Sequence, residues 1–238
     1  RACTNAANHH HPDIIYAEHS GKLNGFSVET IRNWISVLEK TDIILSIKEE
    51  TKRISLKIGD KNSMHAEPIS EFIHFLIINN IPRDIVIKFL KFHYADGTTN
   101  GTGNERSNVI EYKDNNIDDF IEINKYFNDK NFKNKCIERF VLKGRNSKNS
   151  IDLLILGTVN DFFYLNKDDI IDLINNIDVD STSIHVGPLF IQPLSRNLNR
   201  NPKYEKCRYS IQVKWYNLFD HIIIYKSQKL IGFKEAKN

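Results

Sequence analysis

The pattern of apolar and polar positions changes along the first hundred residues from helical spacing to short runs. Residues 26–40 carry apolar side chains at helical spacing and predict a helix. Two short apolar stretches follow, Asp42–Ile47 and Arg53–Ile58, and the polar residues between them predict a hairpin of two strands. Pro68–Asn79 then presents one apolar helical face, with Pro68 in its first turn. This order of helix, hairpin and helix indicates an α/β fold.

The remainder of the chain repeats the α/β character after a loop rich in Gly, Thr and Asn, Asp96–Asn108. That loop lacks the Gly-Lys-Ser/Thr ending of a nucleoside triphosphate site. Two interpretations of it stay open: a flexible surface loop, or a segment that becomes ordered on DNA. Helices are predicted at Pro82–His93, Ile117–Phe127, Asn131–Phe140 and Lys167–Ile177, and strands at Ile151–Leu156, Phe162–Tyr164, Ser183–Ile191, Arg208–Trp215 and His221–Tyr225.

Composition places the chain among folded globular proteins. Its 238 residues are 40% hydrophobic and 26% charged, and we expect a single domain over residues 1–238. Cys3, Cys136 and Cys207 lie far apart without metal-ligand spacing, which favours a reducing cytoplasm over a disulfide framework or a zinc site. We expect no membrane partner, because no apolar run reaches the roughly 18 residues of a membrane span. The net charge of +3 does not decide the partner.

One pair of residues suggests chemistry at the predicted hairpin. Hydrolysis of a phosphodiester by a metal-dependent nuclease needs carboxylates to hold a hard cation and a positive side chain near the attacking water. Asp42 opens the first predicted strand, and Lys57 lies near the end of the second, 57 − 42 = 15 positions later. Antiparallel pairing would bring these strand ends close together.

This arrangement resembles the PD-(D/E)XK pattern of many type II restriction endonucleases, in which an aspartate precedes an acidic-x-lysine tripeptide on the next strand. Two positions depart from the pattern: Thr41 stands where proline is nominal, and the tripeptide Ser55-Leu56-Lys57 has no acid. A subgroup of these enzymes has Ser-x-Lys and takes its second carboxylate from the helix that follows. The resemblance continues through Gly59, Asn62, Ser63, His65 and Glu67.

The resemblance implies a restriction-endonuclease-like core, a mixed central sheet flanked by helices, with the catalytic part at about 26–95. It also implies a Mg²⁺ site held by Asp42 and by Glu67 or Glu71, the latter 71 − 57 = 14 positions after the lysine. We favour Glu67, and Glu18 is a further candidate ligand from the first helix. Lys57 would position the attacking water.

Candidate DNA contacts fall in two places. Asn62, Ser63 and His65 precede the predicted helix, where capping and packing are the alternative roles. The second group belongs to residues 183–215, where a basic, Asn-rich loop lies between two predicted strands and supplies side chains suited to base edges and phosphates. Alternation predicts that Arg208, Ser210, Gln212 and Lys214 share one face of the second strand, and a solvated edge strand is the alternative interpretation. The candidates here are Arg196, Asn197, Arg200, Gln212 and Lys214.

The function expected from the resemblance is site-specific cleavage of double-stranded DNA by a homodimer with one centre per subunit. Two alternatives stay open. One is a non-catalytic DNA-binding protein in which the apparent triad is accidental. The other is a nuclease of the same fold that acts in repair or recombination and recognises DNA structure instead of sequence.

Overall fold

The computed structural model describes residues 43–47, 50–57, 63–103, 106–144, 149–157, 162–194 and 207–235. The chain divides into two compact units, each built from segments far apart in sequence. Unit 1 comprises residues 1–62, 137–176 and 217–238, and unit 2 comprises residues 63–136 and 177–216. The helix predicted at residues 26–40 lies outside the described residues, and the single domain stays a prediction.

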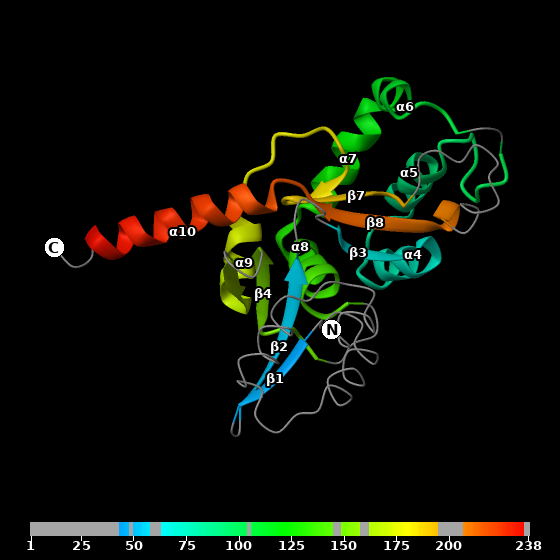
Figure 1. Ribbon diagram of the computed structural model, residues 1–238. Helices are drawn as coiled ribbons and strands as arrows, with labels where there is room; N and C mark the ends of the chain where they lie inside the picture. The colour runs from blue at the N-terminus through cyan, green and yellow to red at the C-terminus, as the bar shows by residue number, and fades with distance from the viewer. Residues whose placement is uncertain are drawn as a thin grey trace. The chain divides into compact units, whose positions relative to one another are not determined.

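Unit 1 contains a mixed four-stranded sheet in the order β1-β2-β4-β5 (Figure 1). Its strands are β1 (Ile43–Ile47), β2 (Glu50–Lys57), β4 (Leu153–Gly157) and β5 (Phe162–Asn166). β2 pairs antiparallel with β1 and parallel with β4, while β4 and β5 are antiparallel. The predicted hairpin is confirmed, and its second strand begins earlier than predicted, at Glu50, which pairs with Ile47.

The other elements of unit 1 are the π-helix η1 (Glu138–Lys143) and the helices α9 (Lys167–Asn176) and α10 (Leu218–Glu235). The Tyr225 hydroxyl on α10 lies 3.1 Å from Asp169 Oδ1 and 2.8 Å from Asp172 Oδ2, both on α9. These polar contacts fix the packing of α10 on α9. The strand predicted at residues 221–225 is therefore wrong, because this segment lies inside α10.

Unit 2 contains an antiparallel four-stranded sheet in the order β3-β8-β7-β6. Its strands are β3 (Ser63–Pro68), β6 (His185–Val186), β7 (Leu189–Pro193) and β8 (Ser210–Trp215). One strand was expected at residues 183–191, but two form, because the chain turns at Gly187, whose φ is 51°. β3 was not predicted, since residues 60–63 favoured a turn before the next helix.

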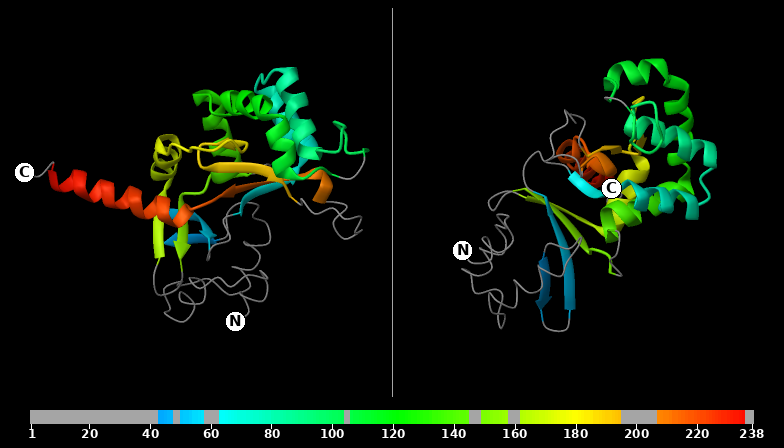
Figure 2. Two further views of the ribbon diagram at one scale, coloured as in Figure 1. Left: turned by 90° about the horizontal axis from the view of Figure 1, so that it is seen from above. Right: turned by 90° about the vertical axis from the view of Figure 1, so that its right-hand side faces the viewer.

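The helices of unit 2 are α4 (Ile69–Ile78), α5 (Arg83–Tyr94), α6 (Val109–Asn115), α7 (Ile117–Phe127) and α8 (Lys130–Ile137), which ends at the boundary with unit 1. Both views of Figure 2 show these helices, cyan to green, gathered beside one another. Phe72 lies at their centre, with its ring centroid 5.1 Å from that of Phe89 and 6.1 Å from that of Phe127. Such aromatic packing supplies much of the burial that stabilises the unit.

The α/β class predicted from the sequence is confirmed, but the described strands form two sheets where one central sheet was expected. The physical reason is β3, which follows the β1–β2 hairpin and pairs with β8 from the far end of the chain. No helix among the described residues is both long and apolar enough to cross a membrane.

Candidate functional site

β8 presents polar side chains on one face and apolar side chains on the other. Ile211, Val213 and Trp215 are each 0% exposed, whereas Gln212 and Lys214 between them are half-buried. The alternation predicted for this strand is thus confirmed from residue 210 to residue 215.

The polar side of β8 continues onto both neighbouring strands. On β7, Gln192 pairs with Gln212 and Phe190 pairs with Lys214. On β3, Ser63 pairs with Lys214, and its Oγ accepts a hydrogen bond of 3.1 Å from Gln212 Nε2. We call this surface the polar sheet face and define it by Ser63, Phe190, Gln192, Ser210, Gln212 and Lys214.

The polar sheet face has the chemistry of a nucleic-acid contact surface. A glutamine amide both donates and accepts hydrogen bonds and therefore matches the edge of adenine, while a lysine matches phosphate. The described candidates Ser63, Gln212 and Lys214 all lie on this face, since the strands pair them directly.

His65 and Glu67 of β3 pair with buried residues of β8 and not with its polar ones. The register between β3 and β8 shifts between Ser63 and His65, and His65 then pairs with Val213 and Glu67 with Ile211. His65 Nε2 lies 3.2 Å from Glu67 Oε2, and the Glu67 residue is only 3% exposed. The second half of β3 thus buries a histidine–carboxylate pair.

The local structure corrects two expectations about residues 63–68. Ser63 and His65 were expected just before a helix, but both lie on β3. Pro68 was expected in the first turn of that helix, but it ends β3 and precedes α4, which begins at Ile69. The strand forms because residues 63–68 find hydrogen-bond partners on β8, which outweighs the local preference for a turn.

Glu71 differs from Glu67 in its surroundings. It lies in the first turn of α4, where a carboxylate interacts favourably with the helix dipole, and it is exposed to solvent. Of the two glutamates considered as metal ligands, Glu71 is the accessible one, and both belong to unit 2.

Lys57 ends β2 in unit 1, where it pairs with Leu156 of β4 and is half-buried. Ser55, two residues earlier, is 1% exposed. Ser55 and Lys57 share one face of β2 and Leu56 lies on the other, and the half-buried lysine stands at the carboxyl end of the strand, after two buried residues. The remaining predicted site residues lie outside the described residues: Glu18, Asp42, Asn62, Arg196, Asn197 and Arg200.

The part of the chain that the structure describes holds no assembled metal-binding group. Within ranges 43–57, 63–144, 149–194 and 207–235, with their gaps, no three His, Cys, Asp or Glu side chains lie where they could share a metal ion. The described carboxylates alone therefore do not form a metal centre.

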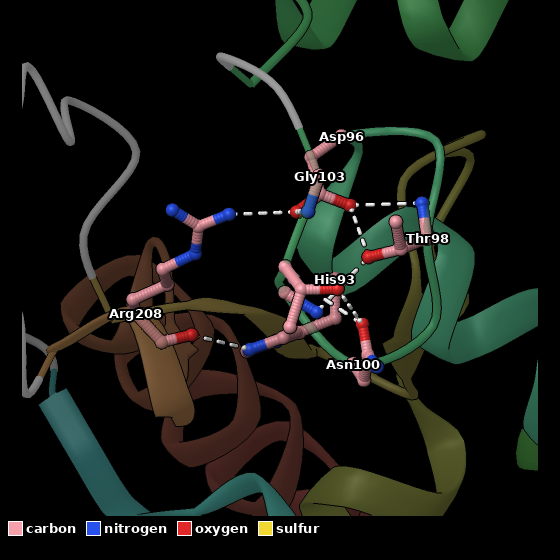
Figure 3. Close-up of polar contacts among 8 residues, drawn as sticks. His93, Asp96, Thr98, Asn100, Gly103 and Arg208 are labelled. Atoms are coloured by element: carbon pink, nitrogen blue, oxygen red, sulfur yellow. Dashed lines mark hydrogen bonds and ion pairs between the residues drawn. The ribbon is translucent and has the colours of Figure 1, made fainter.

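The glycine-rich loop after α5 is ordered around one buried carboxylate, Asp96 (Figure 3). Asp96 Oδ1 accepts hydrogen bonds from the Thr98 backbone nitrogen at 2.9 Å and from Thr98 Oγ1 at 2.7 Å. Asp96 Oδ2 accepts from Gly103 N at 3.1 Å and forms an ion pair of 2.6 Å with Arg208 Nη2. These contacts join residues 96, 98 and 103 to one another and to Arg208, and a role of this loop in DNA binding stays a prediction.

Arg208 links this loop to the residues just before β8. Its backbone oxygen lies 3.0 Å from His93 Nε2, as Figure 3 also shows, and His93 is 1% exposed. Burial lowers the pKa of His93 to about 4, although the Arg208 hydrogen bond opposes the shift. The ring is therefore neutral near pH 7 and donates to the Arg208 carbonyl.

The carboxylate of Asp96 is held in its charged form. Burial raises its pKa, but the hydrogen bonds from Thr98, Arg208 and Gly103 together outweigh that effect and leave the pKa below its ordinary value. An Asp-Gly-Thr sequence is a known turn signal, because the aspartate side chain binds backbone nitrogens that follow it. That signal indicated a turn at Asp96, but nothing in the sequence indicated Arg208 as its partner.

No protein-family model matches this chain, and no curated protein matches it either.

Proposed function

We propose that this chain is a Mg²⁺-dependent, site-specific endonuclease of double-stranded DNA, of the PD-(D/E)XK type. The observation that carries the proposal is the position of Lys57, which ends an interior strand of a mixed sheet as the last residue of Ser55-Leu56-Lys57. A mixed sheet flanked by helices is the core that the resemblance implies. The confirmed hairpin of β1 and β2 supports the same assignment.

In this proposal Lys57 is the cationic residue of the cutting site, and its ammonium group orients the attacking water and offsets the negative charge that builds on phosphorus. Asp42 and a glutamate supply the carboxylates. Glu67 and Glu71 both stay candidates for that role: Glu67 is buried beside His65, and Glu71 is exposed. When bound, Mg²⁺ would supply Lewis-acid stabilisation of phosphate oxygens.

The polar sheet face supports DNA binding in unit 2. Its two glutamine amides lie side by side on paired strands, and a lysine is next to them. In sequence, Arg196, Asn197 and Arg200 follow β7 and add further side chains suited to bases and phosphates. A homodimer with two such surfaces would read a palindromic site and cut one strand with each subunit.

One observation favours a second candidate, a DNA-binding protein without catalytic activity. The described residues hold no metal-binding group, and the buried His65–Glu67 pair has the character of a structural element. Such a protein would bind DNA equally well with and without Mg²⁺. A structure-specific nuclease of the same fold would instead cut without a fixed site.

The experiment is incubation of the purified protein with long unmethylated duplex DNA in Mg²⁺ and, in parallel, in EDTA. We expect discrete fragments in Mg²⁺, none in EDTA, and none with the Asp42→Ala variant in either buffer. Binding without cutting in Mg²⁺ would contradict the proposal and favour the non-catalytic candidate. Cutting that gives a smear or requires branched DNA would contradict site specificity.

A further inference from the structure

Unit 2 contains a cavity of about 240 Å³ at the side of β7, outside the site proposed for cutting. Four of its nine lining residues are aromatic, and they come from α5, α7, β7 and the residue after β8. Its volume lies below the roughly 300–1,000 Å³ usual for drug-sized ligands, so the ligand it fits is small. The lining residues that matter here are Phe92, Lys113, Phe120, Phe190, Gln192 and Tyr216.

The rings form an inner and an outer pair. Phe92 and Phe120 are 5% and 2% exposed, with ring centroids 5.2 Å apart. Phe190 and Tyr216 are also 5.2 Å apart, and Tyr216 is 41% exposed. A planar ligand would therefore meet an aromatic floor and an aromatic rim that is open to solvent.

Polar groups at the rim suit a planar ring with hydrogen-bonding edges. The Tyr216 hydroxyl lies 3.4 Å from Gln192 Oε1, which places an amide and a hydroxyl together beside the rings. Lys113 of α6 adds a positive charge to the lining. In such a site the aromatic faces stack on a base, the amide binds the polar edge of the base, and the cation binds its phosphate.

The cavity shares two residues with the polar sheet face. Gln192 pairs with Gln212 on β8, and Phe190 pairs with Lys214. A nucleic-acid strand lying on Gln212 and Lys214 would thus run beside the cavity within one unit. A base can leave a helical stack when aromatic side chains take the place of its stacking partners.

We infer that this cavity binds a nucleobase. The inference deepens the proposed function, and the part in which the base belongs to bound DNA rests on that function. The recognition chemistry itself does not depend on the proposed function, because a base of a DNA strand and the base of a free nucleotide offer the same ring, edge and phosphate. The experiment separates these two sources.

The test is photocrosslinking with 5-iodouracil, followed by mass-spectrometric mapping of the modified residues. One sample holds the full chain with 5-iodo-2′-deoxyuridine monophosphate, and another holds it with a duplex of mixed sequence that carries 5-iodouracil in place of thymine. EDTA is present throughout so that the duplex stays intact. We expect adducts at Phe190 or Tyr216 with the duplex, and weaker labelling of the same residues with the mononucleotide.

Adducts only outside the cavity with both probes would overturn the inference. Labelling of Phe190 or Tyr216 by the mononucleotide alone would support a base site but overturn its use for DNA. If the protein cuts no DNA while the mononucleotide labels the cavity, the proposed function fails and the base site stands. If it cuts DNA at fixed sites while neither probe labels the cavity, only the present inference fails.

Variants give a second measurement. Tyr216→Leu removes the rim ring and should weaken binding of the mononucleotide about tenfold. Tyr209→Leu is the matched control, since Tyr209 flanks the other end of β8 and is 40% exposed against 41% for Tyr216. Tyr216→Phe keeps the ring and should retain most of the labelling, and equal binding by all three variants would contradict the site.

Discussion

β3 and β8 pair with each other, yet their polar residues meet opposite environments. On β8, Gln212 and Lys214 alternate with fully buried residues and stay half-exposed. On β3, the register shift after Ser63 places Glu67 opposite Ile211, where it is 3% exposed beside His65. Polar residues therefore serve the fold in the second half of β3 and the surface on β8.

This difference shows that a charged residue in a motif-like segment should be assigned a role only after the burial of its side chain is known. A buried carboxylate next to a histidine costs folding free energy when one partner is removed, whereas a half-exposed amide or lysine can be removed with little effect on folding. The predictions below test this division, beginning with the largest effect.

Replacement of Glu67 by Ala should lower the free energy of unfolding by about 3–5 kcal/mol, because it removes one member of the buried His65–Glu67 pair. Urea denaturation followed by circular dichroism would measure the change. Glu71→Ala, four residues further on and exposed, is the matched control and should change stability by less than about 0.5 kcal/mol. A stable Glu67→Ala protein that has lost DNA cleavage would assign Glu67 to the cutting site.

Asp96→Ala should destabilise by about 2–3 kcal/mol, because it leaves the nitrogens of Thr98 and Gly103 and the guanidinium of Arg208 without their acceptor. Asp118→Ala, at an exposed position in the first turn of α7, serves as control. Thermal unfolding and limited proteolysis in the 96–103 loop would both report the loss. An unchanged cleavage pattern in that loop would show that Asp96 does not order it.

The neutral His93 predicts acid sensitivity in a defined pH window. Its folded pKa of about 4 lies below the ordinary 6.5, so the unfolded chain takes up a proton first as the pH falls. This contribution to stability is present above pH 6.5 and is lost as the pH falls below it, and the loss should amount to about 2 kcal/mol at pH 5. Asp96 acts in a separate window, below its ordinary pKa of 3.8.

The measurement is urea unfolding at pH 7 and pH 5 for the wild type and for His93→Gln. The lowered pKa of His221 adds acid sensitivity to both proteins, so the difference between them isolates His93. Equal losses of stability in the two proteins would contradict a buried neutral His93.

Gln212→Ala should weaken DNA binding about tenfold, the effect of losing one good contact to a base edge, while stability changes by no more than about 1 kcal/mol. Ser63→Ala removes the same Gln212–Ser63 hydrogen bond but leaves the amide in place, and its loss of DNA affinity should be smaller than that of Gln212→Ala. Fluorescence anisotropy with labelled duplex would compare them. Equal weakening in both variants would assign the loss to disturbed structure.

Local sequence patterns were sufficient where neighbouring residues determine the element. The β1–β2 hairpin, α5, α7 and α9 lie close to their predicted ranges, because apolar periodicity and nearby turn residues define them. α6 was missed although a signal was available: Asn108 accepts a hydrogen bond from Ile110 N, and Glu111 stands at the third helical position.

Local patterns failed where distant residues decide. Ile222, Ile223 and Ile224 form a β-branched run that favours a strand, but α10 forms because Leu218, Ile222 and Tyr225 are buried at helical spacing. β3 depends on β8, which lies more than 140 residues away (210 − 68 = 142). The ion pair between Asp96 and Arg208 likewise joins residues far apart in the sequence, and the local composition does not indicate it.

The central claim is that Lys57 acts at a DNA-cutting site. The most direct measurement is the rate of DNA cleavage in Mg²⁺ by Lys57→Ala, beside Lys52→Ala, an exposed position on the same strand β2. Both variants should bind DNA as the wild type does, and Lys57→Ala should cut about 10²–10³-fold more slowly while Lys52→Ala keeps its rate. Cleavage by a folded Lys57→Ala protein at the wild-type rate would contradict the account.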